Sequence, residues 1–199
     1  MKKRFLVSWL IIGLVLVSCS KNTGPTTPDQ NSSPEEIVIA LADEVIDALR
    51  NQDMQAVSEL AHLVKGVRFS PYAYVQDKDL FFTPDQLVGL FENSTKYLWG
   101  HQDGSGRPLE MTFEEYYNDF VYDRDYKNAE KKSLNERIGG GSSIDNSQEY
   151  YSGGMVVEYY FSGSNPDFLG MDWNSLRLVF QKEENRWYLV GIIHDEWTI

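Results

Sequence analysis

The sequence has a single cysteine, Cys19, and only three histidines among its 199 residues. One cysteine excludes a disulfide within the chain. The histidines, His62, His101 and His194, lie far apart, and their spacing is not that of a zinc site. The sequence also lacks a Gly-x-Ser-x-Gly elbow, a phosphate-binding loop and a dinucleotide fingerprint. We therefore expect no cofactor and no metal, and no motif indicates a reaction class.

Positive charge is scarce as well. The chain has 18 Lys and Arg against 30 Asp and Glu, which gives a net charge of −12. Phosphate backbones and anionic lipid surfaces repel such a polyanion. Nucleic acid is therefore not an expected partner, and the plain interpretation of the charge is an acidic, well-solvated surface.

No apolar run is long enough to cross a membrane as a helix. The longest runs from Phe5 to Val17 and is interrupted only by Ser8 and Gly13. A crossing helix needs roughly 20 apolar residues, whereas a shorter run after a positively charged start is typical of a signal peptide. The first four residues include two lysines and an arginine. We therefore predict a signal peptide over residues 1–18.

The run ends in Leu16-Val17-Ser18-Cys19. This segment resembles the lipobox of bacterial lipoprotein precursors. The resemblance implies that the Cys19 thiol accepts a diacylglyceryl group and becomes the new N-terminus after cleavage. Several acyl chains, at about 0.8 kcal/mol per buried methylene, anchor a protein firmly. The lipid bilayer is then a partner through acylated Cys19, on the extracytoplasmic side of the inner or the outer membrane. The alternative is an ordinary secreted protein.

Residues 19–33 are polar, with two prolines and no apolar periodicity, and are expected to form a flexible tether. Residues 34–199 suit one domain. Helical spacing or capping boxes predict helices over 34–50, 56–64, 83–93 and 112–123. Strand patterns cover 67–75, 97–99, 155–161, 176–180 and 186–199.

The last segment, Arg186 to Ile199, is apolar on both alternating faces and must be covered on both. We expect it to be the central strand of a curved antiparallel sheet with helices on one side. Helices followed by strands indicate an α+β fold. The order resembles the nuclear-transport-factor-2-like (cystatin-like) architecture, a cone-shaped sheet whose helices fill the concave side. The stretches 68–72, 103–106 and 194–198 are also similar to a group of uncharacterised bacterial lipoproteins.

Asp195 is the candidate for acid–base chemistry. Strict alternation puts it on the face of Trp187, Leu189, Ile193 and Trp197, where burial would raise the pKa of its carboxyl. The alternative is a carboxylate at the rim, either hydrated or paired with an arginine (Arg177 or Arg186). His194 points to the other face and is expected to be structural. A bulge at Gly191 would exchange the two faces.

Aromatic side chains could line a cleft for a sugar or another flat ligand. The candidates are Trp99, Tyr116, Tyr117, Trp173, Trp187 and Trp197, and of these Trp99, Tyr116, Trp187 and Trp197 are the proposed pocket residues. The alternative is that these rings belong to the core. The loop from His101 to Gly106 has a faint likeness to a calcium loop, but it offers one carboxylate and fits a tight turn better.

Two functions are compatible with these features. The first is a non-catalytic binding or scaffolding lipoprotein of the cell envelope, whose partner is an envelope protein or a small molecule. The second is a small-molecule isomerase, dehydratase or hydrolase that uses a pocket carboxylate such as Asp195. A closed cavity that contains Asp195 favours the enzyme, and a filled interior favours the binding protein.

Overall fold

The structure is a computed structural model, and it describes residues 32–198. The predicted signal peptide, the lipobox with Cys19 and most of the tether lie outside the described residues. Within residues 32–198, every helix is too short or too polar to cross a membrane.

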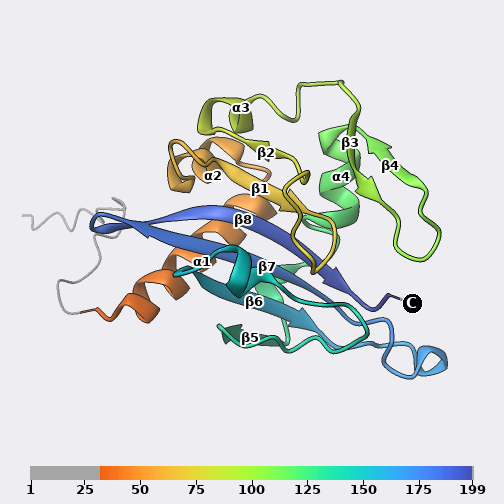
Figure 1. Cartoon of the computed structure of the whole chain (residues 1–199). Helices are drawn as coiled ribbons and strands as arrows, with labels where there is room; N and C mark the ends of the chain where they lie inside the picture. The colour runs from red at the N-terminus through yellow and green to blue at the C-terminus, as the bar shows by residue number, and fades with distance from the viewer. Residues whose placement is uncertain (1–31, 199) are drawn as a thin grey trace, which may run out of the picture. The chain divides into compact units, whose positions relative to one another are not determined.

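The elements follow the predicted order of helices first and long strands last (Figure 1). The α-helices are α1 (Pro34–Arg50), α2 (Met54–Leu60), α3 (Pro84–Val88), α4 (Phe113–Phe120) and α5 (Ser147–Tyr150), with short 3₁₀ turns at Tyr126–Asn128 and Pro166–Phe168. The strands are β1 (Val67–Ser70), β2 (Phe81–Phe82), β3 (Tyr97–His101), β4 (Pro108–Met111), β5 (Lys131–Leu134), β6 (Met155–Phe161), β7 (Asn174–Glu183) and β8 (Arg186–Glu196).

Three helices start at the capping residues that the sequence predicts, Ser33, Thr83 and Thr112. Before α1, Ser33 Oγ accepts from the Glu36 amide at 3.2 Å, and the Glu36 carboxylate accepts from the Ser33 amide at 2.8 Å. Thr112 and Glu115 cap α4 in the same reciprocal way, and before α3 the Gln86 side-chain oxygen accepts from the Thr83 amide at 2.9 Å. These pairs satisfy amides that have no partner inside a helix.

Helix ends depart from the prediction because distant segments compete for the backbone. We expected the second helix to reach Val64, but α2 ends at Leu60. The next residues turn to the sheet, and the His62 amide donates to the Leu189 carbonyl at 3.0 Å. Gly66 has φ +63°, and a Cβ there would lie 2.2 Å from the Phe82 carbonyl oxygen, so this turn requires glycine. Helix α3 likewise ends at Val88, short of the predicted Asn93.

Six strands form one sheet in the order β2-β1-β8-β7-β6-β5, while β3 and β4 form a separate hairpin. The last strand lies inside the sheet, as predicted. The sheet is mixed rather than wholly antiparallel, because β1 runs parallel to β8 while the other pairs are antiparallel. The α+β class with N-terminal helices on a sheet is confirmed. Strand β4 was not predicted, since its Pro108 and Glu110 are poor strand formers.

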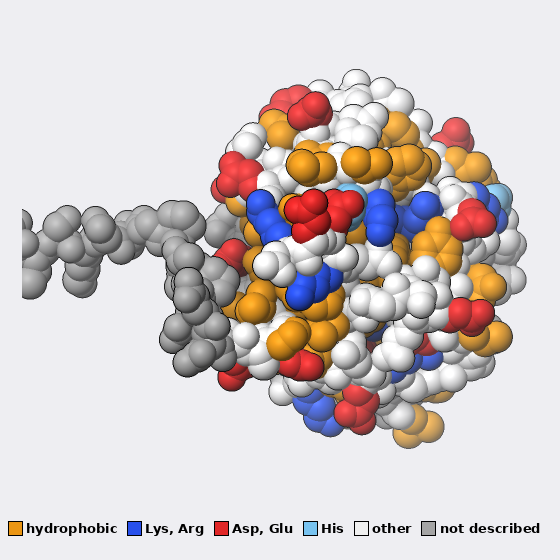
Figure 2. Space-filling model, turned by 60° about the vertical axis from the view of Figure 1, so that its left-hand side comes forward, with side chains coloured by type: hydrophobic (Ala, Val, Ile, Leu, Met, Phe, Trp, Pro, Cys, Tyr) orange, Lys and Arg blue, Asp and Glu red, His pale blue; other side chains and the backbone are white. Residues whose placement is uncertain are grey.

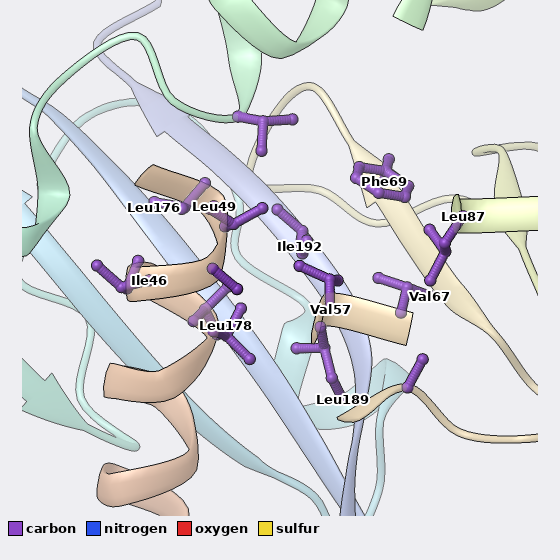
Figure 3. Packing of buried hydrophobic residues seen from close by; sticks show 14 of the residues in the cluster. Ile46, Leu49, Val57, Val67, Phe69, Leu87, Leu176, Leu178, Leu189 and Ile192 are labelled. Atoms are coloured by element: carbon purple, nitrogen blue, oxygen red, sulfur yellow. The ribbon is translucent and has the colours of Figure 1, made fainter. Parts of the chain in front are cut away.

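Both faces of the sheet are covered. Helix α1 packs on one face, which we call the helix face; α5 and the segment before it lie over the other, which we call the outer face (Figure 1). Figure 3 shows the helix face, where side chains of α1 and α2 meet those of β1, β7 and β8; the labelled contacts include Ile46, Leu49, Val57, Val67, Phe69, Leu176, Leu178, Leu189 and Ile192. A smaller apolar cluster on the outer face joins Val75, Tyr151, Val156, Val179, Val190 and Ile193.

A bulge in β8 decides which residues reach which face. Phe180 pairs with Leu189, but its neighbour Val179 pairs with Gly191, so β8 holds one extra residue at this point. Before the bulge Leu189 points to the helix face; after it Ile192 does, and Ile193 points outward. The expectation that Asp195 shares a face with Trp187 and Leu189 is therefore wrong, although it does share one with Ile193.

Replacing the buried Leu178 with alanine should lower the free energy of unfolding by about 2–5 kcal/mol, because a cavity replaces a fully enclosed side chain. Urea unfolding measures the change. Leu63→Ala is the matched control: Leu63 is 69% exposed, and its loss should change the stability by less than about 0.5 kcal/mol. Equal effects of the two substitutions would contradict the described core.

Candidate functional site

Asp195 is held in a bidentate ion pair on the outer face. Its side chain is 1% exposed; Arg137 Nε lies 2.8 Å from Oδ2, and Arg137 Nη2 lies 3.0 Å from Oδ1. Burial raises the pKa of Asp195, and the charges of Arg177 and Arg137 oppose this rise without cancelling it. Of the two arginines expected as partners, Arg177 lies nearby, with its Nε at 3.8 Å, and Arg186 does not. Arg186 instead donates to the Glu59 carbonyl at 2.9 Å.

The second arginine completes a partly buried cluster of two cations and two carboxylates. Arg177 is 1% exposed, and its Nη1 lies 2.5 Å from Asp145 Oδ2. Arg137 also donates to the Ser143 carbonyl and hydroxyl oxygens at 2.9 and 2.7 Å. The cluster therefore fastens the segment 137–145 onto the sheet. Because every carboxylate oxygen of Asp195 already accepts from an arginine, this carboxylate is engaged in structure and is not free to take a proton from a substrate.

The proposed aromatic pocket residues do not form one pocket. Trp99 and Tyr116 stack with their ring centres 3.8 Å apart, and each is 1% exposed. They lie in the main core, where Phe69 and Phe113 pack edge-on to one another and Phe69 packs edge-on to both rings of the stack. Trp187 is also a core residue, at the opposite end of β8 from Trp197. The rings thus fill the interior beneath the helices.

Trp197 belongs to an open hollow at the end of β8. The hollow has a volume of about 560 Å³, and Trp197 is 36% exposed there. Tyr72 and Phe120 supply two further rings, packed edge to face at 6.1 Å. The polar side chains of the hollow come from the 102–107 loop and from the strand end; they are Gln102, Asp103, Ser105, Arg107, Glu196 and Thr198.

The 102–107 loop is a tight turn, as expected. The Gln102 amide donates to the Arg107 carbonyl at 2.7 Å, and Gly104 and Gly106 have φ values of +71° and +66°. The Asp103 amide donates to the Tyr72 hydroxyl at 3.3 Å, which joins the turn to the segment after β1. No group of three acidic, histidine or cysteine side chains that could hold a metal occurs in the part of the chain that the structure describes.

A buried histidine–carboxylate pair lies beneath this hollow on the helix face. His194 Nε2 is 3.6 Å from Asp123 Oδ2, and the His194 side chain is 2% exposed under the Phe120 ring. Asn174 Nδ2 donates to Asp123 Oδ2 at 2.5 Å, and Tyr126 Oη donates to Asp123 Oδ1 at 2.8 Å. Burial alone lowers the pKa of His194, but the Asp123 carboxylate more than offsets this, so the pKa is raised.

The titration of nearby carboxyls follows from the same environment. Burial raises the pKa of Glu196, which lines the hollow, and the His194 charge only partly opposes this. Burial also raises the pKa of Asp123, but the interaction with His194 and the hydrogen bond from Tyr126 outweigh burial, so the pKa of Asp123 is lowered. The hollow therefore has at its edge a carboxyl whose pKa is raised, and below its floor the pair of His194 and Asp123.

Sequence reasoning placed Trp197 at a possible pocket and missed the residues that complete it. Tyr72 follows a proline after β1, and the 102–107 turn joins β3 to β4. Only the tertiary structure brings these two segments to the end of β8. Asp123 was likewise not recognised as the partner of His194. The sequence signals for the hollow were the glycines of the turn and the aromatic residue after Pro71. Neither signal shows which distant segment the residue contacts.

No protein-family model and no curated protein matches the chain. Among solved structures, it is similar to a putative calcium/calmodulin-dependent protein kinase II association domain from Xanthomonas campestris, with 11% identity and a TM-score of 0.36 over 83% of this chain and 89% of that one. A DUF4783 family protein from Bacteroides ovatus matches with 10% identity and a TM-score of 0.28, covering 77% of this chain and 92% of its own.

A chain named Rd1NTF2_05, which carries several substitutions, matches with 12% identity and a TM-score of 0.31, over 79% of this chain and 95% of that chain. At these identities and scores the three likenesses assign neither a family nor a function. The architecture rests on the helices and the sheet described above.

The pair of His194 and Asp123 should make stability depend on pH. Because the pKa of His194 is raised in the folded state, its contribution is complete below about pH 6.5 and is lost as the pH rises through the raised pKa. The free energy of unfolding falls by about 1.4 kcal/mol for each unit by which folding raises the pKa of His194. Urea unfolding between pH 6 and 9 should show this decline in the wild type and not in His194→Gln. Replacing the exposed His101 with glutamine should leave the decline unchanged; an identical profile for His194→Gln would contradict the pairing.

Proposed function

We propose that the chain is a membrane-anchored, extracytoplasmic lipoprotein whose domain binds a ligand without catalysing a reaction. The anchor is acylated Cys19, and residues 19–33 are the tether that carries the domain away from the bilayer. The ligand that we propose is a flat polar molecule such as a sugar ring of an envelope glycan. Its site is the open hollow that Tyr72, Phe120 and Trp197 share with the 102–107 loop.

One observation carries the binding role: the interior beneath the helices is packed with side chains. Trp99 and Tyr116 stack at 3.8 Å in that interior, and both are 1% exposed. Asp195, the candidate base, lies on the other face between two arginines. An enzyme of the isomerase or hydrolase kind needs a carboxylate or imidazole within reach of a bound substrate. The hollow at the end of β8, in contrast, is open to a ligand.

The chemistry of the hollow suits a sugar. Aromatic faces pack against the apolar face of a sugar ring, and a few polar groups at the edge fix its orientation. Trp197 and Tyr72 offer the rings, and Gln102, Asp103 and Glu196 offer donors and acceptors. Glu196 has a raised pKa, so it changes from acceptor to donor at a higher pH than an ordinary glutamate.

The enzyme alternative would use the pair of His194 and Asp123 below the hollow. Both ring nitrogens of His194 are buried, and the Phe120 ring packs edge-on against the imidazole. A substrate in the hollow would meet Phe120 before it met His194. The pair therefore supports the wall of a binding site better than it supports proton transfer to a ligand.

The anchor has a direct test. Cells that express the full chain and are grown with a palmitate analogue should incorporate the label into the wild type, because the Cys19 thiol is the group that accepts the lipid. Cys19→Ala should carry no label and should leave the membrane fraction. Cys19→Ser is the closer steric control and should behave like Cys19→Ala; label in either variant would contradict the assignment.

The hollow is tested by titrating the full-length protein with soluble tetrasaccharides of glucose and of N-acetylglucosamine. Trp197→Ala should weaken the binding of the preferred sugar about tenfold or more, because a stacked ring is lost. Calorimetry measures the dissociation constants. Tyr74→Ala is the control: Tyr74 is another exposed ring, 51% exposed, that does not line the hollow, and its loss should have no effect. Wild-type affinity in Trp197→Ala would exclude this site.

A further inference from the structure

A second hollow, on the outer face, has the opposite electrostatic character. It has a volume of about 500 Å³ and lies where the turn after α2, the β1–β2 edge and α5 meet. Its cationic side chains are Lys65 and Arg68, and its rings include Phe81 and Tyr150. No acidic residue is among those that line it, although the chain as a whole carries a charge of −12. Figure 2 shows one face of the molecule, on which Lys and Arg side chains lie beside Asp and Glu side chains across the middle, with hydrophobic side chains above and below.

Arg68 is fixed in place on one side only. Its Nη1 donates to the backbone carbonyls of Gln76 at 3.2 Å and Asp77 at 3.0 Å, and it also contacts the carbonyl of Asp79. The guanidinium carbon lies 5.6 Å from the centre of the Phe81 ring and 5.5 Å from that of Tyr150. Three carbonyls and two rings therefore orient the group before any ligand arrives.

The other side of the same guanidinium is open. Arg68 Nε and Nη2 make no hydrogen bond within residues 32–198, and neither is among the buried atoms without a partner. These two nitrogens form one of the edges on which a guanidinium holds an oxyanion through two parallel hydrogen bonds.

Lys65 adds a second positive charge to the hollow. Its Nζ donates to Gln181 Oε1 at 2.8 Å, and an ammonium has two more donors. Within the described residues, neither Lys65 nor Arg68 has a carboxylate within 4.0 Å.

The nearby acids are engaged elsewhere. The carboxylate of Asp79 accepts from Ser70 Oγ at 2.6 Å, and that of Asp77 accepts from the Tyr150 hydroxyl at 2.9 Å. Glu183 lies 3.4 Å from His62. The charge of Arg68 also acts on the buried Asp79 carboxyl and partly opposes the burial that raises its pKa, but in the described part of the chain no carboxylate contacts either cation of the hollow.

We propose that this hollow binds a small oxyanion, a carboxylate or a phosphate ester, carried on an aromatic or apolar body. The anion takes the Nε–Nη2 edge of Arg68 and the ammonium of Lys65. The body packs against Phe81 and the exposed side chain of Val64, which is 80% exposed in the free protein. This site is separate from the hollow of Trp197, and the inference does not depend on the function proposed there.

Phenyl phosphate is the probe, with inorganic phosphate and phenol as its two halves, and calorimetry at low salt on the full chain is the measurement. Phenyl phosphate should bind more tightly than either half. Lys65→Gln should raise its dissociation constant about three- to fivefold, as expected for one partly exposed charge. Arg68→Lys should raise it about tenfold, because it keeps the charge and loses the two-pronged geometry.

Lys131→Gln is the matched control. Lys131 is exposed on β5, its Nζ lies 5.8 Å from the centre of the Tyr160 ring, and it is remote from the hollow. The affinity should be unchanged by Lys131→Gln, and also by Trp197→Ala. If Lys131→Gln weakens binding as much as Lys65→Gln does, or if phenol binds as tightly as phenyl phosphate, the proposal is overturned.

Vesicles of phosphatidylglycerol distinguish a lipid headgroup from a free anion. If vesicles bind in an Arg68-dependent way and phenyl phosphate does not bind, the hollow is a lipid site and the proposal fails. Because Arg68→Lys could disturb the segment 76–79, its thermal unfolding is measured alongside. Lys65→Gln, whose side chain is at the surface, tests the site without that complication.

Discussion

The bulge in β8 is the constraint on which both faces of the domain depend. Because Val190 is an extra residue between the paired Leu189 and Gly191, the alternation of the strand is shifted by one position. His194 then points under the helices to Asp123, and Asp195 points outward to Arg137 and Arg177. Without the bulge, the Asp195 carboxylate would enter the apolar core with no cation beside it, at a cost of several kcal/mol.

Gly191 makes the bulge compatible with the layer above it. A Cβ at this position would lie 2.7 Å from the Tyr151 hydroxyl oxygen, closer than packing allows. Tyr151 in turn packs with Val179, Val190 and Ile193 in the outer cluster. One glycine therefore lets the sheet change register and lets α5 approach it. The segment 137–145 leads into α5, and the arginine–carboxylate cluster fastens this segment to the sheet.

Local chemistry explains what could be predicted from the sequence. Capping pairs at Ser33, Thr83 and Thr112 involve residues three apart, and these three helix starts were predicted. Strand β6 and the central place of β8 followed from runs of apolar residues. Helix ends were predicted less well, because the backbone of His62 bonds to Leu189, over a hundred residues away in the chain. Gly191 suggested a bulge, but only the pairing with β7 shows that one is present.

The candidate sites depend on pairings that no local pattern contains. Arg137 and Asp195 are 58 residues apart, and the sequence offered Arg177 and Arg186 as equal alternatives. The stacked Trp99 and Tyr116 were candidates for a ligand pocket and proved to be core. Trp99 lies on β3 and Tyr116 on α4, and the two rings stack where these elements pack together. Long-range assembly decides whether a ring or a charge is buried, so composition alone cannot separate a core from a site.

The overall charge and the local charge of the domain act at different distances. A polyanion held near an anionic bilayer is repelled by it as a whole, so the proposed tether would keep the domain away from the lipid surface. Screening limits this repulsion to a Debye length of about 8–10 Å at physiological salt. A small anion that enters the outer hollow is governed by Lys65 and Arg68 at contact distance, where screening is weak. The same charge distribution therefore disfavours a flat anionic membrane as the occupant of the hollow and admits a small anionic molecule.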